Sequence, residues 1–336
     1  MTRRLVTLVL ALSLLGVAST DAEKADDVLK AGGRLSGQNL AGRDLAGADL
    51  RGADLTRANL DGAILTGATL VGADLTGASL RDADLREAYL RDVRARGADF
   101  RGARLASADL TRADLREARF AGADLTRAVL ETVNLARADL QMAFLPGARL
   151  ARARLAGARL TRATLVGADL SQADLAGADF TGAELGAAHL AESAPGAARM
   201  PGVTAAKTNF TDANLQNVDL REATLTGAVF VGANLGWADL TWARARGADL
   251  SRASLAWARG YGADFSSASF SQANLTRTQL VGANLGRADF RRARLQGTNF
   301  EQADMEGSDF GGAELTQTLF NAAKGVPADA RGARTR

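Results

Sequence analysis

The chain has 336 residues, a formal net charge of +3 and no cysteine. The absence of cysteine excludes a disulfide framework and a lipoprotein anchor. The charge is near neutral for a chain of this length, so it favours neither nucleic acid nor a membrane surface as a partner.

Residues 1–18 have the features of a secretory signal peptide. A basic start with Arg3 and Arg4 is followed by an apolar segment and then by small residues. We expect cleavage after Ala18, with Ala22 as an alternative, and hence a periplasmic or secreted protein. An uncleaved membrane anchor is the other interpretation, although the apolar segment is short for a membrane span. Cleavage lowers the formal net charge from +3 to +1, because both arginines leave.

Residues 19–34 are predicted to cap the N-terminal end of the fold. The segment 23–31 reads as a short helix, and Gly32 and Gly33 follow it, as suits a helix C-terminus. We expect this helix to cover the first turn of the repeated structure that follows, because repeat proteins need a cap at each end.

From about residue 35 the sequence repeats every five residues. A leucine occupies every fifth position, an alanine lies two positions before it, and Asp or Asn usually lies between them, as in Ala48, Asp49 and Leu50. This period fits neither an amphipathic helix nor an alternating strand. It is satisfied if the chain turns a corner once per repeat, so that the leucine and alanine of a short extended piece point to the same side. Self-similarity at a fixed period indicates a solenoid.

The A-(D/N)-L-x-x pattern resembles that of the pentapeptide-repeat family, from about Leu35 to Phe320. The resemblance implies an all-β fold, namely a right-handed quadrilateral parallel β-helix with four repeats in each coil. Leu or Phe and Ala would lie inside the tube, and neighbouring coils would pair like parallel strands, about 4.8 Å apart. Two blocks of repeats are predicted, 35–190 and 208–320.

Residues 191–207 break the pattern between the two blocks. Pro195 falls where a leucine is expected. Because Leu190 and Phe210 are twenty residues apart, we expect an irregular coil or loop that replaces one coil and leaves the axis of the tube unchanged. Residues 321–336 lose the period and are predicted to form a C-terminal tail.

No residue stands out as catalytic, cofactor-binding or metal-binding. His189 is the single histidine and takes an outward position, so we interpret it as a surface residue. The aspartates recur at one outward position of the repeat, where Arg, Thr, Asn and Ser also occur, and this pattern predicts a mixed-charge surface. We therefore expect no enzyme, no cofactor and no small-molecule substrate.

The first candidate for an interaction surface is a partial basic belt. Arg149, Arg154 and Arg159 occupy the same outward position in three successive repeats, and hence three adjacent sides of one coil. No acidic residue lies between Asp139 and Asp169. The belt either binds phosphate-rich polymers or an acidic protein, or it is simply solvated.

The second candidate is an aromatic cluster, which consists of Trp237, Trp242, Trp257 and Tyr261. Trp237 and Trp257 are twenty residues apart and should stack on one corner, with Trp242 at the next corner. Exposed Trp, Tyr and Arg are typical interface anchors. The alternative is that an aromatic side chain folds inward, because Ala245 and Gly260 leave the centre of this coil thin.

These features predict an exported, non-enzymatic scaffold for structural or protein–protein interactions. The expected partner is another protein or an envelope component rather than nucleic acid, and a homodimer is possible. The alternative, which the family resemblance implies, is a DNA-mimicking protein that binds type II topoisomerases and protects them from quinolones. That activity requires a strongly acidic surface and access to the cytoplasm, whereas the near-neutral charge and the signal peptide point the other way.

Overall fold

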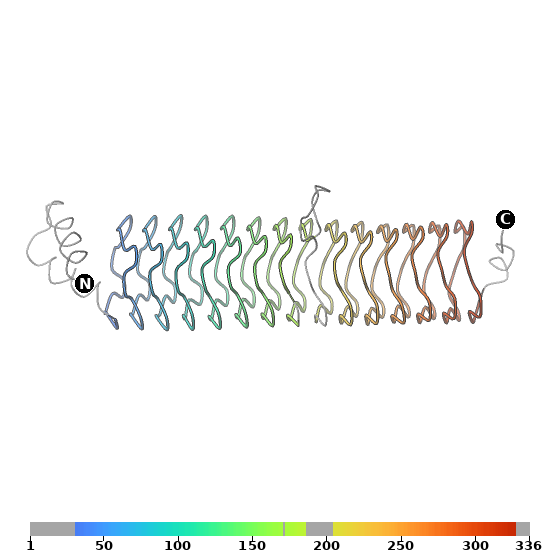
Figure 1. The fold of residues 1–336 in the computed structure, drawn as a ribbon, viewed down its shortest axis with the longest axis horizontal. Coiled ribbons are helices and arrows are strands. Elements are labelled where there is room, and N and C mark those ends of the chain that lie inside the picture. Colours follow the sequence, from blue (N-terminus) through green and yellow to red (C-terminus); the bar gives the residue numbers. More distant parts are fainter. Residues whose placement is uncertain (1–30, 171, 186–203, 327–336) are drawn as a thin grey trace, which may run out of the picture.

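The repeats form one straight solenoid whose coils stack along a single axis (Figure 1). The computed structural model describes residues 31–170, 172–185 and 204–326. Residues 1–30, which contain the predicted signal peptide and all but the last residue of the predicted capping helix over 23–31, lie outside these ranges, as do residues 327–336. The helix and the signal peptide therefore stay predictions.

Each five-residue repeat makes one side of the tube and one corner. In the repeat around Leu50, the N–H of Ala53 donates to the carbonyl oxygen of Leu50 at 3.1 Å, which closes a four-residue turn. The third residue of this turn, Gly52, has φ +63°. A type II turn requires this left-handed region at that position, and glycine enters it without steric cost.

The extended part of each repeat contributes one residue to a parallel bridge. Asp54 pairs with Arg34 in one neighbouring coil and with Asp74 in the other. The described residues contain no helix and no strand longer than such a single bridge residue. The partners are twenty residues apart, so four repeats complete one coil. The all-β class and the parallel pairing of coils are thereby confirmed.

The Asp or Asn before each leucine stabilises the corner that follows. The Oδ1 atom of Asp49 accepts the backbone N–H of Arg51 at 3.2 Å, and the same bond recurs at Asp54, where the N–H comes from Thr56 at 3.1 Å. Asp and Asn side chains favour turns because they can bond the backbone two residues further on. This local bond explains why the repeat has Asp or Asn at that position.

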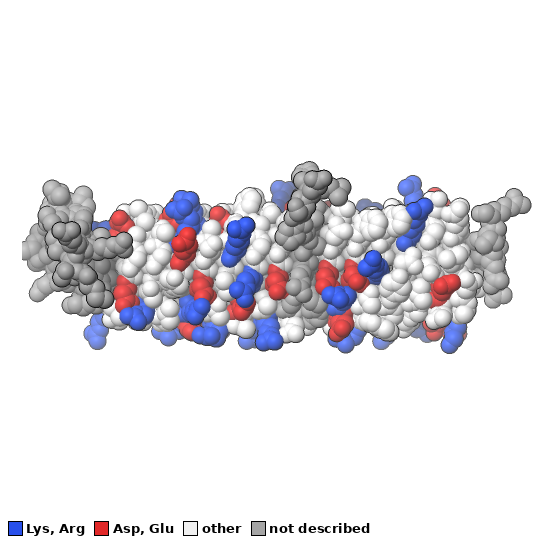
Figure 2. Space-filling view, viewed as in Figure 1, with Lys and Arg blue, Asp and Glu red and all other residues white. Residues whose placement is uncertain are grey.

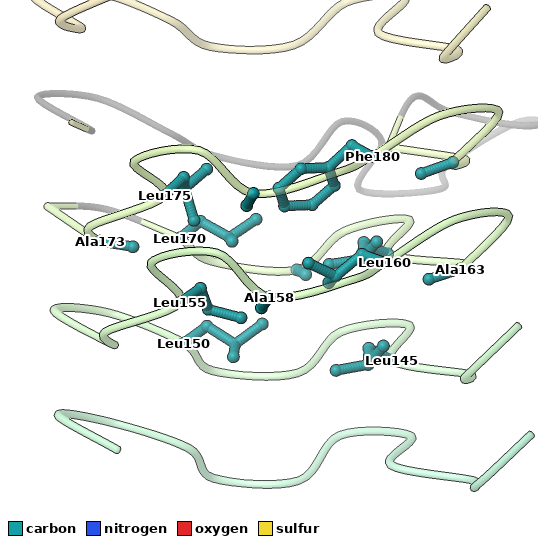
Figure 3. Close-up of a cluster of buried hydrophobic side chains, with 14 of the residues drawn as sticks. Leu145, Leu150, Leu155, Ala158, Leu160, Ala163, Leu170, Ala173, Leu175 and Phe180 are labelled. Carbon is teal, nitrogen blue, oxygen red and sulfur yellow. The ribbon is translucent and has the colours of Figure 1, made fainter. Parts of the chain in front are cut away.

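The interior of the tube is filled by the repeated leucine, phenylalanine and alanine side chains (Figure 3). Leu150, Ala158 and Leu160 have no exposed surface. Phenylalanines on one side stack across coils, with ring centroids 4.7 Å apart for Phe100 and Phe120. This distance agrees with the spacing expected between paired strands.

Buried threonines replace some of the inward alanines without leaving a polar group unpaired. The hydroxyl of Thr298 donates to the carbonyl oxygen of Leu275 at 2.7 Å, and the hydroxyl of Thr318 donates to that of Leu295 at 2.9 Å. Both acceptors belong to the preceding coil. Because each hydroxyl has a partner, these substitutions do not carry the cost of an unsatisfied buried donor.

The register across the interruption corrects one prediction. Asp174 pairs with Thr204, Asp179 with Asn209 and Glu184 with Asn214, so the partners are thirty residues apart rather than twenty. The prediction that the segment replaces one twenty-residue coil is therefore wrong, because this coil contains ten additional residues. The prediction of an unchanged axis is confirmed, since the bridges continue and one tube results (Figure 1).

We expect that deleting residues 191–200 leaves the solenoid folded. The deletion joins Leu190 to Pro201-Gly202, which are favoured residues for the two central positions of a type II turn. The free energy of unfolding, measured by thermal unfolding with far-UV circular dichroism, should change by less than about 1 kcal/mol, because only a connection is shortened. Loss of folding would mean that these ten residues are part of the tube.

Candidate interaction surface

The structure gathers the predicted aromatic residues around one side of the solenoid, which we call the aromatic face. One corner carries Trp237, Trp257 and Arg277, and the next corner carries Trp242 and Tyr261. Between the corners runs a ladder of parallel bridges from Asp239 through Arg259 to Gln279. Aromatic and cationic side chains thus frame a flat side of the tube.

Trp237 and Trp257 stack as predicted. Their ring centroids are 4.8 Å apart and the rings are parallel to within 3°. The guanidinium of Arg277 lies over the Trp257 ring, with its carbon 4.5 Å from the centroid. A guanidinium over an indole is a favourable cation–π arrangement. The three side chains form a column along the corner, one from each of three successive coils.

Trp242 lies along the surface over Gly262, which is twenty residues further on. A Cβ atom added to Gly262 would come within 2.2 Å of the Trp242 ring. Glycine at this position therefore leaves room for the indole, which keeps 64% of its surface exposed. The backbone N–H of Trp242 donates to the carbonyl oxygen of Tyr261 at 2.9 Å, so the two aromatic residues are direct neighbours.

The aromatic side chains do not fold into the thin coil. All four remain exposed, and the space at Gly260 is occupied by core side chains instead. A Cβ atom added to Gly260 would lie 2.9 Å from Cδ2 of Leu280 and 3.3 Å from Cε2 of Phe265. The alternative in which an aromatic residue fills the core is thus wrong for this structure.

The basic belt has the predicted position but is not free of acidic neighbours. Arg149 forms an ion pair with Glu131 of the preceding coil. The backbones of Arg154 and Arg159 form β-bridges with those of Asp174 and Asp179 in the following coil, which places these side chains next to each other. The acid-free stretch in the sequence is therefore interleaved with carboxylates in space, and the belt is part of the mixed-charge surface.

Mixed charge extends over the rest of the surface. On the side seen in Figure 2, Lys and Arg alternate with Asp and Glu without a continuous acidic stripe. The bridge ladders show the same mixture; one of them runs through Asp54, Asp74, Arg94, Asp114, Asn134 and Arg154. The predicted mixed-charge surface is confirmed for the described residues.

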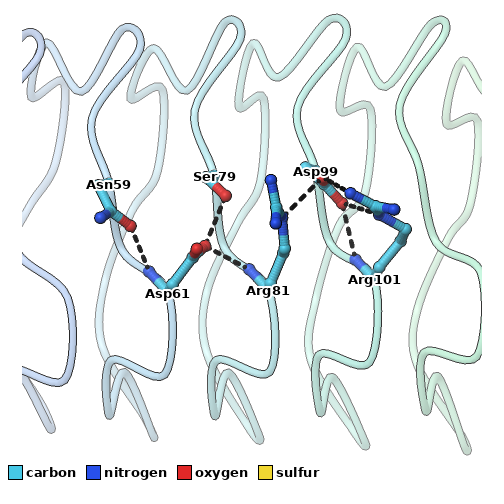
Figure 4. Close-up of polar contacts among 6 residues, drawn as sticks. All are labelled: Asn59, Asp61, Ser79, Arg81, Asp99 and Arg101. Carbon is cyan, nitrogen blue, oxygen red and sulfur yellow. Dashed lines mark hydrogen bonds and ion pairs between the residues drawn. The ribbon is translucent and has the colours of Figure 1, made fainter.

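Polar contacts link the coils along the outside of the tube (Figure 4). Asp61 accepts the backbone N–H of Arg81 at 3.0 Å, and the Nε of Arg81 donates to Asp99 at 3.1 Å. Asp99 also accepts Nε and Nη2 of Arg101 at 2.8 and 2.6 Å. The Arg101 guanidinium holds the pKa of Asp99 below its ordinary value, against the opposing effect of burial.

The same arrangement predicts loss of stability in acid. Arginine guanidinium groups also lower the pKa values of Asp84, Asp114 and Asp289. A carboxylate whose folded-state pKa is depressed stabilises the fold above its unfolded-state pKa, and this contribution is lost as the pH falls through the folded-state value. The urea midpoint should therefore be flat above about pH 5 and fall below about pH 4. When the pH is lowered from above about 5 to below about 4, the urea midpoint of an Asp99→Ala variant should fall by less than that of the native chain. An equal fall in both proteins would contradict the contribution of the Asp99 carboxylate.

The described residues were searched for two further kinds of feature, a metal site and a membrane span. They contain no group of three or more His, Cys, Asp or Glu side chains arranged to hold a metal ion. They also contain no helix long and apolar enough to span a membrane. His189 lies outside the described ranges.

Arg277 and Gly262 also belong to the aromatic face, although neither was predicted from the sequence. The signal was present, because Arg277 follows Trp257 and Gly262 follows Trp242 by one coil of twenty residues. The twenty-residue register places such residues next to each other. Counting twenty residues from each tryptophan identifies both Arg277 and Gly262.

A family model described as pentapeptide repeats matches more than half of the chain, at residues 44–82, 83–120, 113–152, 153–190, 208–244, 238–277 and 283–321. No curated protein matched the chain.

Several solved structures are similar to the chain. HetL, a pentapeptide repeat protein involved in heterocyst differentiation regulation from the cyanobacterium Nostoc sp. strain PCC 7120, is 28% identical over 71% of this chain and 88% of its own, with a TM-score of 0.27. A pentapeptide repeat protein from the Arabidopsis thaliana thylakoid lumen is 34% identical over 30% of this chain and 69% of its own, with a TM-score of 0.29. Full-length QnrB1, a plasmid-mediated fluoroquinolone resistance protein, is 16% identical over 50% of this chain and 84% of its own, with a TM-score of 0.26. The TM-scores are low, and the match to the family model is the stronger finding.

Proposed function

The chain belongs to the pentapeptide-repeat family, and from this premise we propose that it is an exported, non-enzymatic scaffold that binds another protein or an envelope component. The observation that carries the proposal is the aromatic face. Three tryptophans and a tyrosine stay exposed on a tube whose core is complete without them. Trp, Tyr and Arg dominate the binding energy of protein interfaces, so this face is the candidate docking surface.

A non-enzymatic role is supported by where the functional groups lie. Side chains in the interior of the described coils are leucine, phenylalanine, alanine, three valines, one methionine and a few hydrogen-bonded threonines. Active sites need several polar groups that converge in a concave pocket. Here the polar groups point outward from flat sides and pair mainly with one another.

Export is part of the proposal because of the N-terminal segment, residues 1–18. A secreted form that begins at Ser19, or at Glu23 if cleavage follows Ala22, should be recovered outside the cytoplasm. Mass spectrometry of the protein from fractionated cells measures this directly. Recovery of the full-length chain from the cytoplasm alone would contradict export.

A pull-down from envelope and cytoplasmic extracts tests the partner. The native protein should capture an envelope or secreted protein, and the Trp237→Ala/Trp257→Ala variant should lose it. Phe144→Ala is the matched control, because Phe144 is similarly exposed but lies in the first block on another side of the tube. Capture that survives the double substitution would place the docking surface elsewhere.

The alternative, a DNA-mimicking role that protects topoisomerases, has less support. Mimicry of DNA requires a continuous negative stripe, and neutral or basic residues interrupt every bridge ladder of the described residues. If the same pull-down captured gyrase subunits, this alternative would replace the scaffold proposal.

A further inference from the structure

We propose that the aromatic face binds an acidic polypeptide segment, rich in Asp or Glu, of the partner protein. This inference rests on the scaffold function proposed above and names the chemistry of its partner. It follows from the orientation of the indoles and from the two arginines of the face that have no ion-pair partner.

The stacked column presents indole edges rather than indole faces to a ligand. One face of Trp257 is covered by Trp237 and the other by the guanidinium of Arg277. The edge of an aromatic ring is the positive part of its quadrupole, and the indole N–H is a donor only. None of the three indole N–H groups has an acceptor among the described residues. Such edges attract carboxylates.

Two arginines of the aromatic face are also without carboxylate partners. Arg259 lies in the ladder between the two corners, Arg277 lies on the first corner, and neither forms an ion pair with a described residue. Asp239 precedes Arg259 in that ladder, but its Oδ1 accepts the backbone N–H and the hydroxyl of Thr241. In the first block, by contrast, Arg86 and Arg116 are each ion-paired with an aspartate. The guanidinium groups of Arg259 and Arg277 are therefore available to an acidic partner.

The shape of the face favours a polypeptide over an acidic glycan. Small ligands bind in concave sites, whereas flat surfaces with Trp, Tyr and Arg are typical of protein interfaces. In the stacked column, a sugar ring would find neither face of Trp257 free to stack on. Flexible Glu and Asp side chains can instead reach both the indole edges and Arg259 in the middle of the side.

Tryptophan fluorescence tests the proposal at the site itself, because all three tryptophans of the chain lie on this face. The purified protein is titrated at low ionic strength with a synthetic peptide that alternates glutamate and alanine. We expect a saturable change in tryptophan emission, and none with the peptide in which glutamine replaces glutamate. An Arg259→Gln/Arg277→Gln variant should bind the acidic peptide about ten-fold more weakly or worse, since it loses two charged partners.

The matched control is Arg86→Gln/Arg116→Gln, which removes two arginines that are already ion-paired in the first block. It should bind the acidic peptide like the native protein, and circular dichroism should show that both variants are folded. Equal binding by the Arg259→Gln/Arg277→Gln variant would overturn the proposal. So would an absence of any response to the acidic peptide, or tighter binding of an oligogalacturonate than of the peptide.

The two proposals can fail separately. A partner captured in the pull-down and lost in the tryptophan variant, together with no response to the acidic peptide, would leave the scaffold standing and overturn the acidic segment. A fluorescence response to the acidic peptide without any captured partner would support the acidic ligand and contradict the scaffold proposal.

Discussion

Replacing Phe210 by alanine should lower the free energy of unfolding by about 3–5 kcal/mol, the usual cost of truncating a buried phenylalanine. The ring has no exposed surface and stacks between two others, 5.2 Å from the ring centroid of Phe180 and 4.9 Å from that of Phe230. This stack connects the two blocks across the ten additional residues. A cavity here therefore weakens the contact between the blocks as well as the core.

Urea unfolding followed by two signals measures this effect. Far-UV circular dichroism reports on the whole solenoid, whereas tryptophan fluorescence reports on the second block alone. Because repeat proteins are stabilised by contacts between neighbouring repeats, the two signals should separate in Phe210→Ala and coincide more closely in the native chain. Phe144→Ala is the control, since that ring is 53% exposed and should change the stability by no more than about 0.5 kcal/mol. A similar loss in both variants would contradict the role of the stack.

Gly260→Leu should destabilise the protein, although it restores the leucine that the repeat pattern prescribes. The space that a leucine would need is filled by Leu280 and Phe265, which would lie 2.9 and 3.3 Å from the new Cβ atom. Overpacking of a filled core costs about 1–3 kcal/mol. Chemical denaturation of the single variant measures the loss.

A second substitution separates overpacking from other causes. If Leu280 occupies the space, then Leu280→Ala should reduce the penalty of Gly260→Leu, so that the double variant is more stable than the sum of the two losses predicts. An increase in stability on Gly260→Leu alone would mean that a cavity exists at this centre.

Most of the fold could be predicted from the sequence, because one local rule recurs at every repeat. The alanine and leucine of the extended piece fill the tube, and the Asp or Asn oxygen between them bonds the next corner. The residues of each repeat therefore determine one side and one corner of the tube locally. The stacking of Trp237 on Trp257 followed from the same rule.

Two features could not be predicted because they depend on three-dimensional register. Counting from Leu190 to Phe210 gave one coil, but the pairing of Asp174 with Thr204 shows that ten of the intervening residues do not advance the register. The arginine belt was judged from its neighbours in sequence, whereas carboxylates such as Glu131 and Asp179 come from adjacent coils.

The ten additional residues shift the phase between sequence and surface by half a turn. Counted in coils of twenty, Arg149 and Arg259 would lie on opposite sides of the tube. Three ladders continue across the interruption with a spacing of thirty, which leaves the ladder of Tyr89, Arg149 and Asp169 to align with that of Asp219, Asp239 and Arg259. The first block thus turns its exposed Tyr89 toward the same direction as the aromatic face. The length of the insertion therefore determines which side of the first block is aligned with the aromatic face of the second. A different length would align a different side, although no residue of either block had changed.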